Sequence, residues 1–169
     1  MNLSDQVRSH TIAVLVDNEA GVLARVIGLF SGRGYNIESL TVAEIDTEKH
    51  LSRITIVTRG TQAVVEQIMA QLGRLVPVHT VIDLSMDQSV EREMALIKIR
   101  AVGDKRAESL RIAEKFSARV VDETSESFVF EITETAEKLD AFVRLMQPLG
   151  IVDFSRTGVV AITRGPEAM

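Results

Sequence analysis

The residues with the clearest chemical potential form a polar turn between an apolar strand pattern and a helix pattern. The turn contains Asn18 and Gly21 and is followed by Val22 and Leu23. The first turn of a helix offers unpaired backbone N–H groups and a partial positive charge, which favour a bound carboxylate. Glycine allows close approach to the backbone, and the amide of Asn18 can bond both an ammonium group and a carboxylate. The turn therefore suits an amino acid with an apolar side chain.

The same residues also fit a purely structural interpretation. Asparagine is a favoured helix N-cap and glycine is common in turns, so Asn18 and Gly21 could serve the backbone alone. The acidic residues Asp17 and Glu19 do not indicate calcium, because an EF-hand spreads its oxygen ligands over about twelve residues and apolar residues intervene here. A ligand site and a structural turn both remain open for this segment.

Motifs for catalysis are missing from the sequence. His10, His50 and His79 have no second histidine or carboxylate at metal-ligand spacing, and the chain contains no cysteine. It also lacks a G-x-S-x-G elbow, a P-loop and a complete dinucleotide fingerprint. The segment Gly32-Arg33-Gly34 follows the predicted helix and is expected to end it. We expect no catalytic residue and no metal ligand.

Composition excludes further classes of protein. Of the 169 residues 46% are hydrophobic and 25% are charged, and no apolar run reaches the roughly 20 residues of a membrane helix. Residues 1–9 are polar and mixed in charge, unlike a signal peptide, so a cytoplasmic location is expected. The net charge of -5 disfavours nucleic acid as a partner, and the few aromatic residues, among them Phe128 and Phe130, lack the basic neighbours of an RNA-binding sheet.

Apolar periodicity predicts the elements that position the turn. Residues 10–16 resemble a half-buried strand, and Val22, Val26 and Phe30 recur on one face of the following helix. Thr61 is placed to cap a second helix. Further strands are expected at residues 37–45, 51–58 and 76–84. The first half of the chain therefore has the order βαββαβ.

The same order returns after the polar segment 85–91, which we predict to be a linker. The predicted elements are a strand at 94–102, a helix at 105–116, strands at 118–122 and 128–133, a helix at 136–146 and a strand at 151–162. We therefore predict an α+β protein with two ferredoxin-like βαββαβ domains, residues 1–84 and 92–169. Each should form a four-stranded antiparallel sheet with both helices on one face.

Two helices cannot cover both faces of such a sheet. We therefore expect the second domain or another subunit to complete the burial of apolar strand residues in the first domain, and we expect the protein to form oligomers. The residues concerned are Val14, Val42, Ile54 and Ile56.

A long, nearly gap-free motif around the turn resembles a known family. The motif comprises residues 18–23, 25–31, 33–42 and 51–56, with weaker similarity at 90–93, 98–99, 138–142 and 156–160. It is similar to the small, regulatory subunit of acetolactate synthase, also called acetohydroxyacid synthase, whose N-terminal part is an ACT domain. The resemblance covers nearly the whole chain.

The resemblance implies a non-catalytic subunit in branched-chain amino acid biosynthesis. Such subunits activate a separate large subunit that carries thiamine diphosphate, magnesium and FAD, and they confer allosteric feedback inhibition by valine. None of these cofactors is expected on this chain. The implied effector site combines Asn18, Gly21, Val22 and Leu23 of one subunit with Asn36 and Ile37 of its partner in a homodimer joined through the ACT domains.

Other functions remain open besides a valine-responsive regulator. The chain could be a structural activator, or an ACT-type amino-acid sensor that does not respond to valine. An independent enzyme would require a nucleophile, base or cofactor motif that the sequence lacks. The second domain also carries a basic set that is either a docking surface or a solvated face: Lys98, Arg100, Lys105, Arg106 and Arg111.

Overall fold

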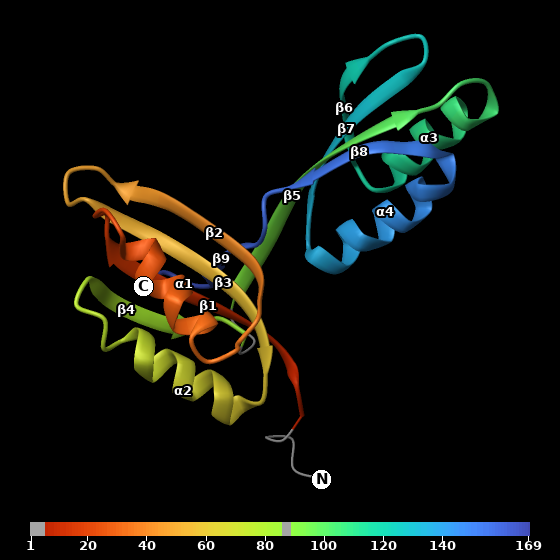
Figure 1. Ribbon diagram of the computed structural model, residues 1–169. Coiled ribbons are helices and arrows are strands. Elements are labelled where there is room, and N and C mark those ends of the chain that lie inside the picture. Colours follow the sequence, from red (N-terminus) through yellow and green to blue (C-terminus); the bar gives the residue numbers. More distant parts are fainter. Residues whose placement is uncertain (1–5, 86–88) are drawn as a thin grey trace. The chain divides into compact units, whose positions relative to one another are not determined.

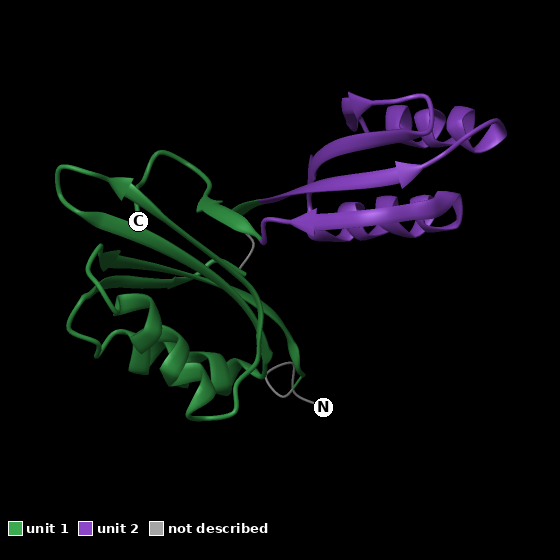
Figure 2. Ribbon diagram, turned by 45° about the horizontal axis from the view of Figure 1, so that its top comes forward, with its two compact units in different colours: residues 1–91, 159–169 green, residues 92–158 purple. Residues whose placement is uncertain are grey.

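The computed structural model describes residues 6–85 and 89–169, which divide into two compact units (Figure 2). Within the described residues, the first unit extends to Glu91 and also includes Val159–Met169, whereas the second comprises Arg92–Gly158. This division differs from the predicted one at its C-terminal end, because the last eleven residues were expected to belong to the second domain.

The first unit has the βαββαβ order predicted from the sequence (Figure 1). Its strands form an antiparallel sheet in the order β2-β3-β1-β4, which is the ferredoxin-like arrangement. Its elements are β1 (Arg8–Asp17), α1 (Val22–Ser31), β2 (Ile37–Asp46), β3 (Leu51–Gly60), α2 (Gln62–Leu72) and β4 (Val78–Asp83).

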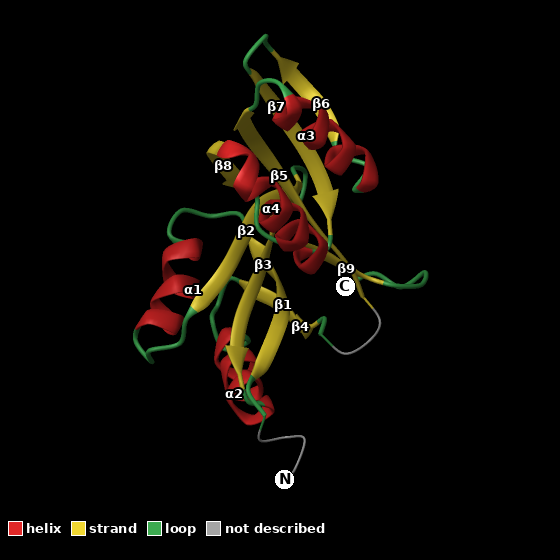
Figure 3. Cartoon of the chain, turned by 90° about the vertical axis from the view of Figure 1, so that its right-hand side faces the viewer, coloured by secondary structure: helices red, strands yellow, loops and turns green. Residues whose placement is uncertain are grey.

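Both helices pack their apolar stripes on one face of this sheet (Figure 3). The stripe of α1 buries Val22, Val26 and Phe30, and the stripe of α2 buries its own residues at three- and four-residue intervals. The Thr61 hydroxyl accepts a hydrogen bond from the Val64 amide at 3.4 Å, so the predicted N-cap of α2 is confirmed. Beneath the helices lies a core that includes Val14, Ile54 and Ile56, all fully buried.

The second unit repeats the order with a sheet whose strands run β6-β7-β5-β8. Its elements are β5 (Ser89–Arg100), α3 (Asp104–Lys115), β6 (Arg119–Glu123), β7 (Ser127–Glu134), α4 (Ala136–Gly150) and β8 (Ile151–Arg156). The predicted linker 85–91 is shorter in the structure, because β5 already begins at Ser89, while residues 86–88 lie outside the described part of the chain. Phe128 and Phe130 are buried in the core against α4, so they do not offer a stacking surface for bases.

The predicted strand at 151–162 is wrong in its extent. The structure breaks it into β8, which ends at Arg156, and β9 (Val160–Thr163). Gly158 adopts a left-handed conformation with φ of 86° at the break, and glycine permits this at little cost. The chain after Gly158 therefore leaves the second unit and becomes part of the first.

Residues 159–169, here called the C-terminal segment, cover the sheet face that α1 and α2 leave open. Val159 and Ala161 pack on Ala13 and Val57, which point away from the helices. The Val159 amide donates to Oγ of Ser39 at 2.9 Å, and the Thr41 hydroxyl donates to the Val159 carbonyl. The open face is therefore buried in part by the chain itself.

Candidate functional site

The turn between β1 and α1 is held by the β2–β3 hairpin and by the residue that precedes β4. The backbone amide of Asn18 donates to the carbonyl of His50 at 2.6 Å, and the Asp17 amide donates to the Pro77 carbonyl at 2.9 Å. Asn18 is exposed and does not cap the helix, because the N-cap is Gly21, with φ of 86° and no side-chain cap bond. The interpretation of Asn18 as the N-cap is therefore wrong, whereas Gly21 does shape the turn.

The first turn of α1 leaves backbone donors free. The Val22 amide donates to the Glu19 carbonyl at 3.3 Å and the Arg25 amide donates to the Gly21 carbonyl at 3.1 Å. Within residues 6–85 and 89–169, the amides of Leu23 and Ala24 have no hydrogen-bond acceptor. The first turn also contains no acidic residue that would offset the positive end of the helix. These two N–H groups can bind one carboxylate.

The apolar candidates of the turn differ in their surroundings. Val22 is only 5% exposed and belongs to the core under α1, so its side chain is not available to a ligand. Leu23 is half-buried and packs against the edge of the same core. Leu23 is therefore the apolar side chain that a ligand at this turn could contact, while Val22 fixes the start of the helix.

Asn36 and Ile37 lie at the other end of the same sheet. Ile37 is paired with Thr58, whose hydroxyl donates to the Asn36 carbonyl at 2.6 Å, whereas Asp17 is paired with Leu51. Seven residues of β3 separate these two pairs, which corresponds to about 23 Å along an antiparallel strand. One copy of the chain therefore does not bring Asn36 and Ile37 to the turn.

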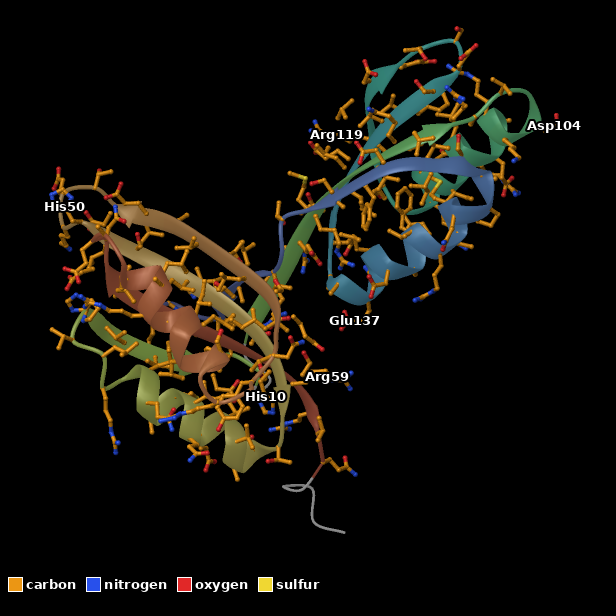
Figure 4. The ribbon with its side chains drawn as sticks, viewed as in Figure 1. His10, His50, Arg59, Asp104, Arg119 and Glu137 are labelled. Atoms are coloured by element: carbon orange, nitrogen blue, oxygen red, sulfur yellow. The ribbon has the colours of Figure 1, made fainter. Side chains whose placement is uncertain are left out.

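Two histidines mark these opposite ends in Figure 4. His50 lies at the β2–β3 hairpin next to the turn, and His10 lies toward the end of the sheet where Thr58 is its cross-strand neighbour. The structure thus separates the sequence-predicted candidates into a turn group and a β2 group. A site that combined the two groups would need a second copy of the chain to supply one of them.

Two histidines lie beside carboxylates that their spacing in the sequence does not reveal. Nδ1 of the fully buried His10 lies 3.2 Å from Oδ2 of Asp83, and Nε2 of His79 lies 2.6 Å from Oδ1 of Asp17. Both pairs link β1 to β4, so only the register of the sheet brings them together. Each pair has a single histidine, and the described residues contain no cluster of three or more side chains suited to a metal ion.

Within residues 6–85 and 89–169, no helix is long and apolar enough to span a bilayer. The remaining candidate chemistry is the binding of a small anion at α1.

Two family models match the chain in succession. The model described as an AHAS small subunit-like ACT domain matches residues 12–80, and the model described as the small subunit of acetolactate synthase matches residues 92–165. Together they cover both units of the structure.

Relatives match over almost their whole length. The probable acetolactate synthase small subunit of Archaeoglobus fulgidus is 48% identical over 156 residues, with 92% of this chain and 97% of the relative covered. The acetolactate synthase small subunit of Mycolicibacterium smegmatis is 42% identical over 167 residues, with 99% and 98% covered. The crystal structure of the small subunit from Thermotoga maritima superposes with a TM-score of 0.85 at 38% identity, with 95% of this chain and 99% of that chain covered.

Proposed function

The chain belongs to the family of acetolactate synthase small subunits, and from this premise we propose that it activates the catalytic subunit and confers feedback inhibition by valine. In this role it is a cytoplasmic, non-catalytic component of branched-chain amino acid biosynthesis. Thiamine diphosphate, magnesium and FAD belong to the catalytic partner.

The observation that carries the valine proposal is the pair of unpaired amides at Leu23 and Ala24 next to the left-handed Gly21. The two amides, at the positive end of the helix dipole, can bind the carboxylate of valine. The exposed side-chain amide of Asn18 provides an acceptor for the ammonium group, and Leu23 provides an apolar contact for the isopropyl group. The turn thus has a counterpart for each part of an aliphatic amino acid.

In a homodimer, the partner copy would supply the β2 group, Asn36 and Ile37, to the turn. Strand β2 is an edge of its sheet, and it exposes Val42 and Ile45 by 45% and 56%. Exposed edges with apolar side chains readily pair with another strand. If two copies pair β2 antiparallel about a two-fold axis between Thr41 and Val42, Ile37 of the partner subunit stands opposite Asp46.

This dimer would bring the two separated groups of candidate residues together. Asp46 is paired with Leu51, and Leu51 is paired with Asp17, so the Asp46 end of β2 is the end of the sheet that carries the turn. The partner's Asn36 would therefore approach the Asn18 turn, and each dimer would contain two equivalent sites. Asn36 and Ile37 of one copy would complete the site on the other copy.

The regulatory mechanism follows from a site at the dimer seam. An effector that contacts both copies stabilises one relative orientation of the protomers, and it shifts the assembly toward the state that it binds more tightly. If valine weakens the binding of the catalytic subunit, that subunit must weaken valine binding by the same factor. Inhibition of turnover itself does not have to obey this symmetry.

An activity titration tests the proposal. The matching catalytic subunit is titrated with this chain, with and without valine, and we expect activation that valine reverses. Thermal unfolding of this chain should also shift, because a ligand at about 100 times its Kd adds roughly 2.7 kcal/mol of stability. Activation without a valine response would instead support a structural activator, and turnover of pyruvate by this chain alone would identify an enzyme.

A further inference from the structure

The backbone of Val159 is held by two side chains of strand β2. Its amide donates to Oγ of Ser39 at 2.9 Å, and its carbonyl accepts a hydrogen bond from the hydroxyl of Thr41. Val159 is 6% exposed and packs with Ala13 and Val57 on the open face of the first sheet. Both backbone polar groups of Val159 therefore bond to side chains of β2.

These two side chains lie on the part of β2 that the proposed dimer uses. Ser39 follows Ile37 by two residues, with an irregularity of the register between them, and Thr41 lies next to the proposed two-fold axis. Both hydroxyl-bearing residues are half-buried. A ligand that orders β2 at Ile37 would therefore also order the two groups that hold Val159.

The residues just before Val159 are held by the second unit. The Gly158 amide donates to Oε1 of Glu93 at 3.2 Å, and the Thr157 amide donates to the Met94 carbonyl at 3.0 Å. Consecutive Cα atoms stay about 3.8 Å apart across a trans peptide, so a shift of Val159 acts directly on Gly158. One peptide bond thus separates the hydrogen bonds of the second unit from those of β2.

We propose that Ser39 and Thr41 are positioning residues that couple β2 to the second unit through Val159. The proposal rests on the proposed function, because valine is the ligand that would order β2. The C-terminal segment is then in equilibrium between a docked and a released state, and both ends of it bias this equilibrium. Valine should favour the docked state and stabilise the end of β8, and a firmly held end of β8 should in turn favour valine binding.

The two hydroxyl groups contribute something that the apolar contacts of the segment do not. Val159 and Ala161 pack on Ala13 of β1 and Val57 of β3, and such apolar contact is not directional. A hydrogen bond instead specifies a distance and an angle between its partners. Loss of the hydroxyl groups should therefore leave the segment packed on β1 and β3 but loosen its link to β2.

Amide hydrogen exchange of the full chain, followed by NMR, tests this coupling first without valine. In a double variant with Ser39→Ala and Thr41→Val, the Thr157 and Gly158 amides should exchange about threefold faster or more, as expected from the loss of a hydrogen bond. The variant Thr41→Ser keeps both hydroxyl groups and should exchange like the parent chain. Circular dichroism checks that each variant is folded.

The second measurement adds valine. At saturation, valine should slow exchange of the same two amides about threefold in the parent chain and in Thr41→Ser. The double variant should still bind valine in calorimetry, but its two amides should not respond. Thr80→Val is the matched control, because Thr80 is half-buried on β4 of the same sheet and takes no part in the hydrogen bonds that hold Val159. Its response to valine should equal that of the parent chain.

Several outcomes would overturn the proposal. One is unchanged exchange of Thr157 and Gly158 in the folded double variant, and another is equal acceleration in Thr80→Val, which would indicate a general loosening of the first unit. A third is valine binding that leaves both amides unchanged in the parent chain, or slows them equally in the double variant. A chain that binds no valine but shows the acceleration would contradict the proposed effector site and leave the coupling through Val159 standing.

Discussion

Glu93 and Arg156 form a bidentate ion pair inside the second unit. Nε of Arg156 lies 2.9 Å from Oε1 of Glu93, and Nη2 lies 2.5 Å from Oε2. Glu93 is 5% exposed, and its hydrogen bond is the main reason that the pKa of Arg156 is raised, with a further contribution from Asp140. The pair joins β5 to the last residue of β8, just before the chain turns at Gly158.

Glu93→Gln should destabilise the protein by about 2 kcal/mol, because it leaves a partly buried guanidinium with one carboxylate instead of two. Urea unfolding measures this change. As a control, Glu134→Gln alters the pair between the last residue of β7 and Lys138, whose side chain is 63% exposed, and should cost less than about 0.5 kcal/mol. Equal effects of the two substitutions would contradict a special role for the Glu93 pair.

Gly21→Asp should abolish the valine response while the chain still activates its catalytic partner, because the new carboxylate repels that of valine. No atom lies within 4 Å of a Cβ at this position, but φ of 86° strains any side chain. Gly21→Asn is the matched control, since it has the same shape and strain without the charge. Valine inhibition measured for both variants should be lost in the first and largely kept in the second.

Mixed dimers test whether the effector site is shared. Chains with Asn18→Ala and chains with Asn36→Ala should each fail to bind valine as homodimers. When the two chains are unfolded and refolded together, one of the two sites in each mixed dimer contains neither substitution. Calorimetry should then detect restored valine binding. A site confined to one copy predicts no restoration in the mixture.

Phe142→Ala should cost about 3–5 kcal/mol of unfolding free energy, because the ring is fully buried and its removal leaves a cavity. Its ring centroid lies 5.4 Å from that of Phe116 and 6.4 Å from that of Phe130. Leu145→Ala on the same helix is the control, since Leu145 is 45% exposed and its loss should cost less than about 1 kcal/mol. Urea unfolding followed by circular dichroism compares the two.

The Asp46 carboxyl should titrate below its ordinary pKa of 3.8, chiefly because it accepts a hydrogen bond from the Lys49 backbone amide. A lowered pKa stabilises the folded state above the unfolded pKa, and this contribution is lost as the pH falls through the folded value. Carbon NMR of the carboxyl group measures the titration. Lys49→Ala keeps the backbone donor, so most of the shift should remain.

Much of the fold was predictable from local patterns. Two-residue alternation and helical repeats identified the two βαββαβ units, because strand and helix periods are properties of neighbouring residues. The Thr61 cap was likewise found from its position before a helix. The motif around Asn18 and Gly21 identified the family for the same reason, since it is continuous in the chain.

The sequence by itself therefore determined the elements, their order and the family. Only the tertiary structure decided that Gly158 ends β8 and that Val159 returns to the first unit, because the apolar face that it covers belongs to strands more than a hundred residues away. The same holds for the distance between Asn18 and Asn36. These relationships depend on sheet register and on which face each side chain takes, and neither is a property of neighbouring residues.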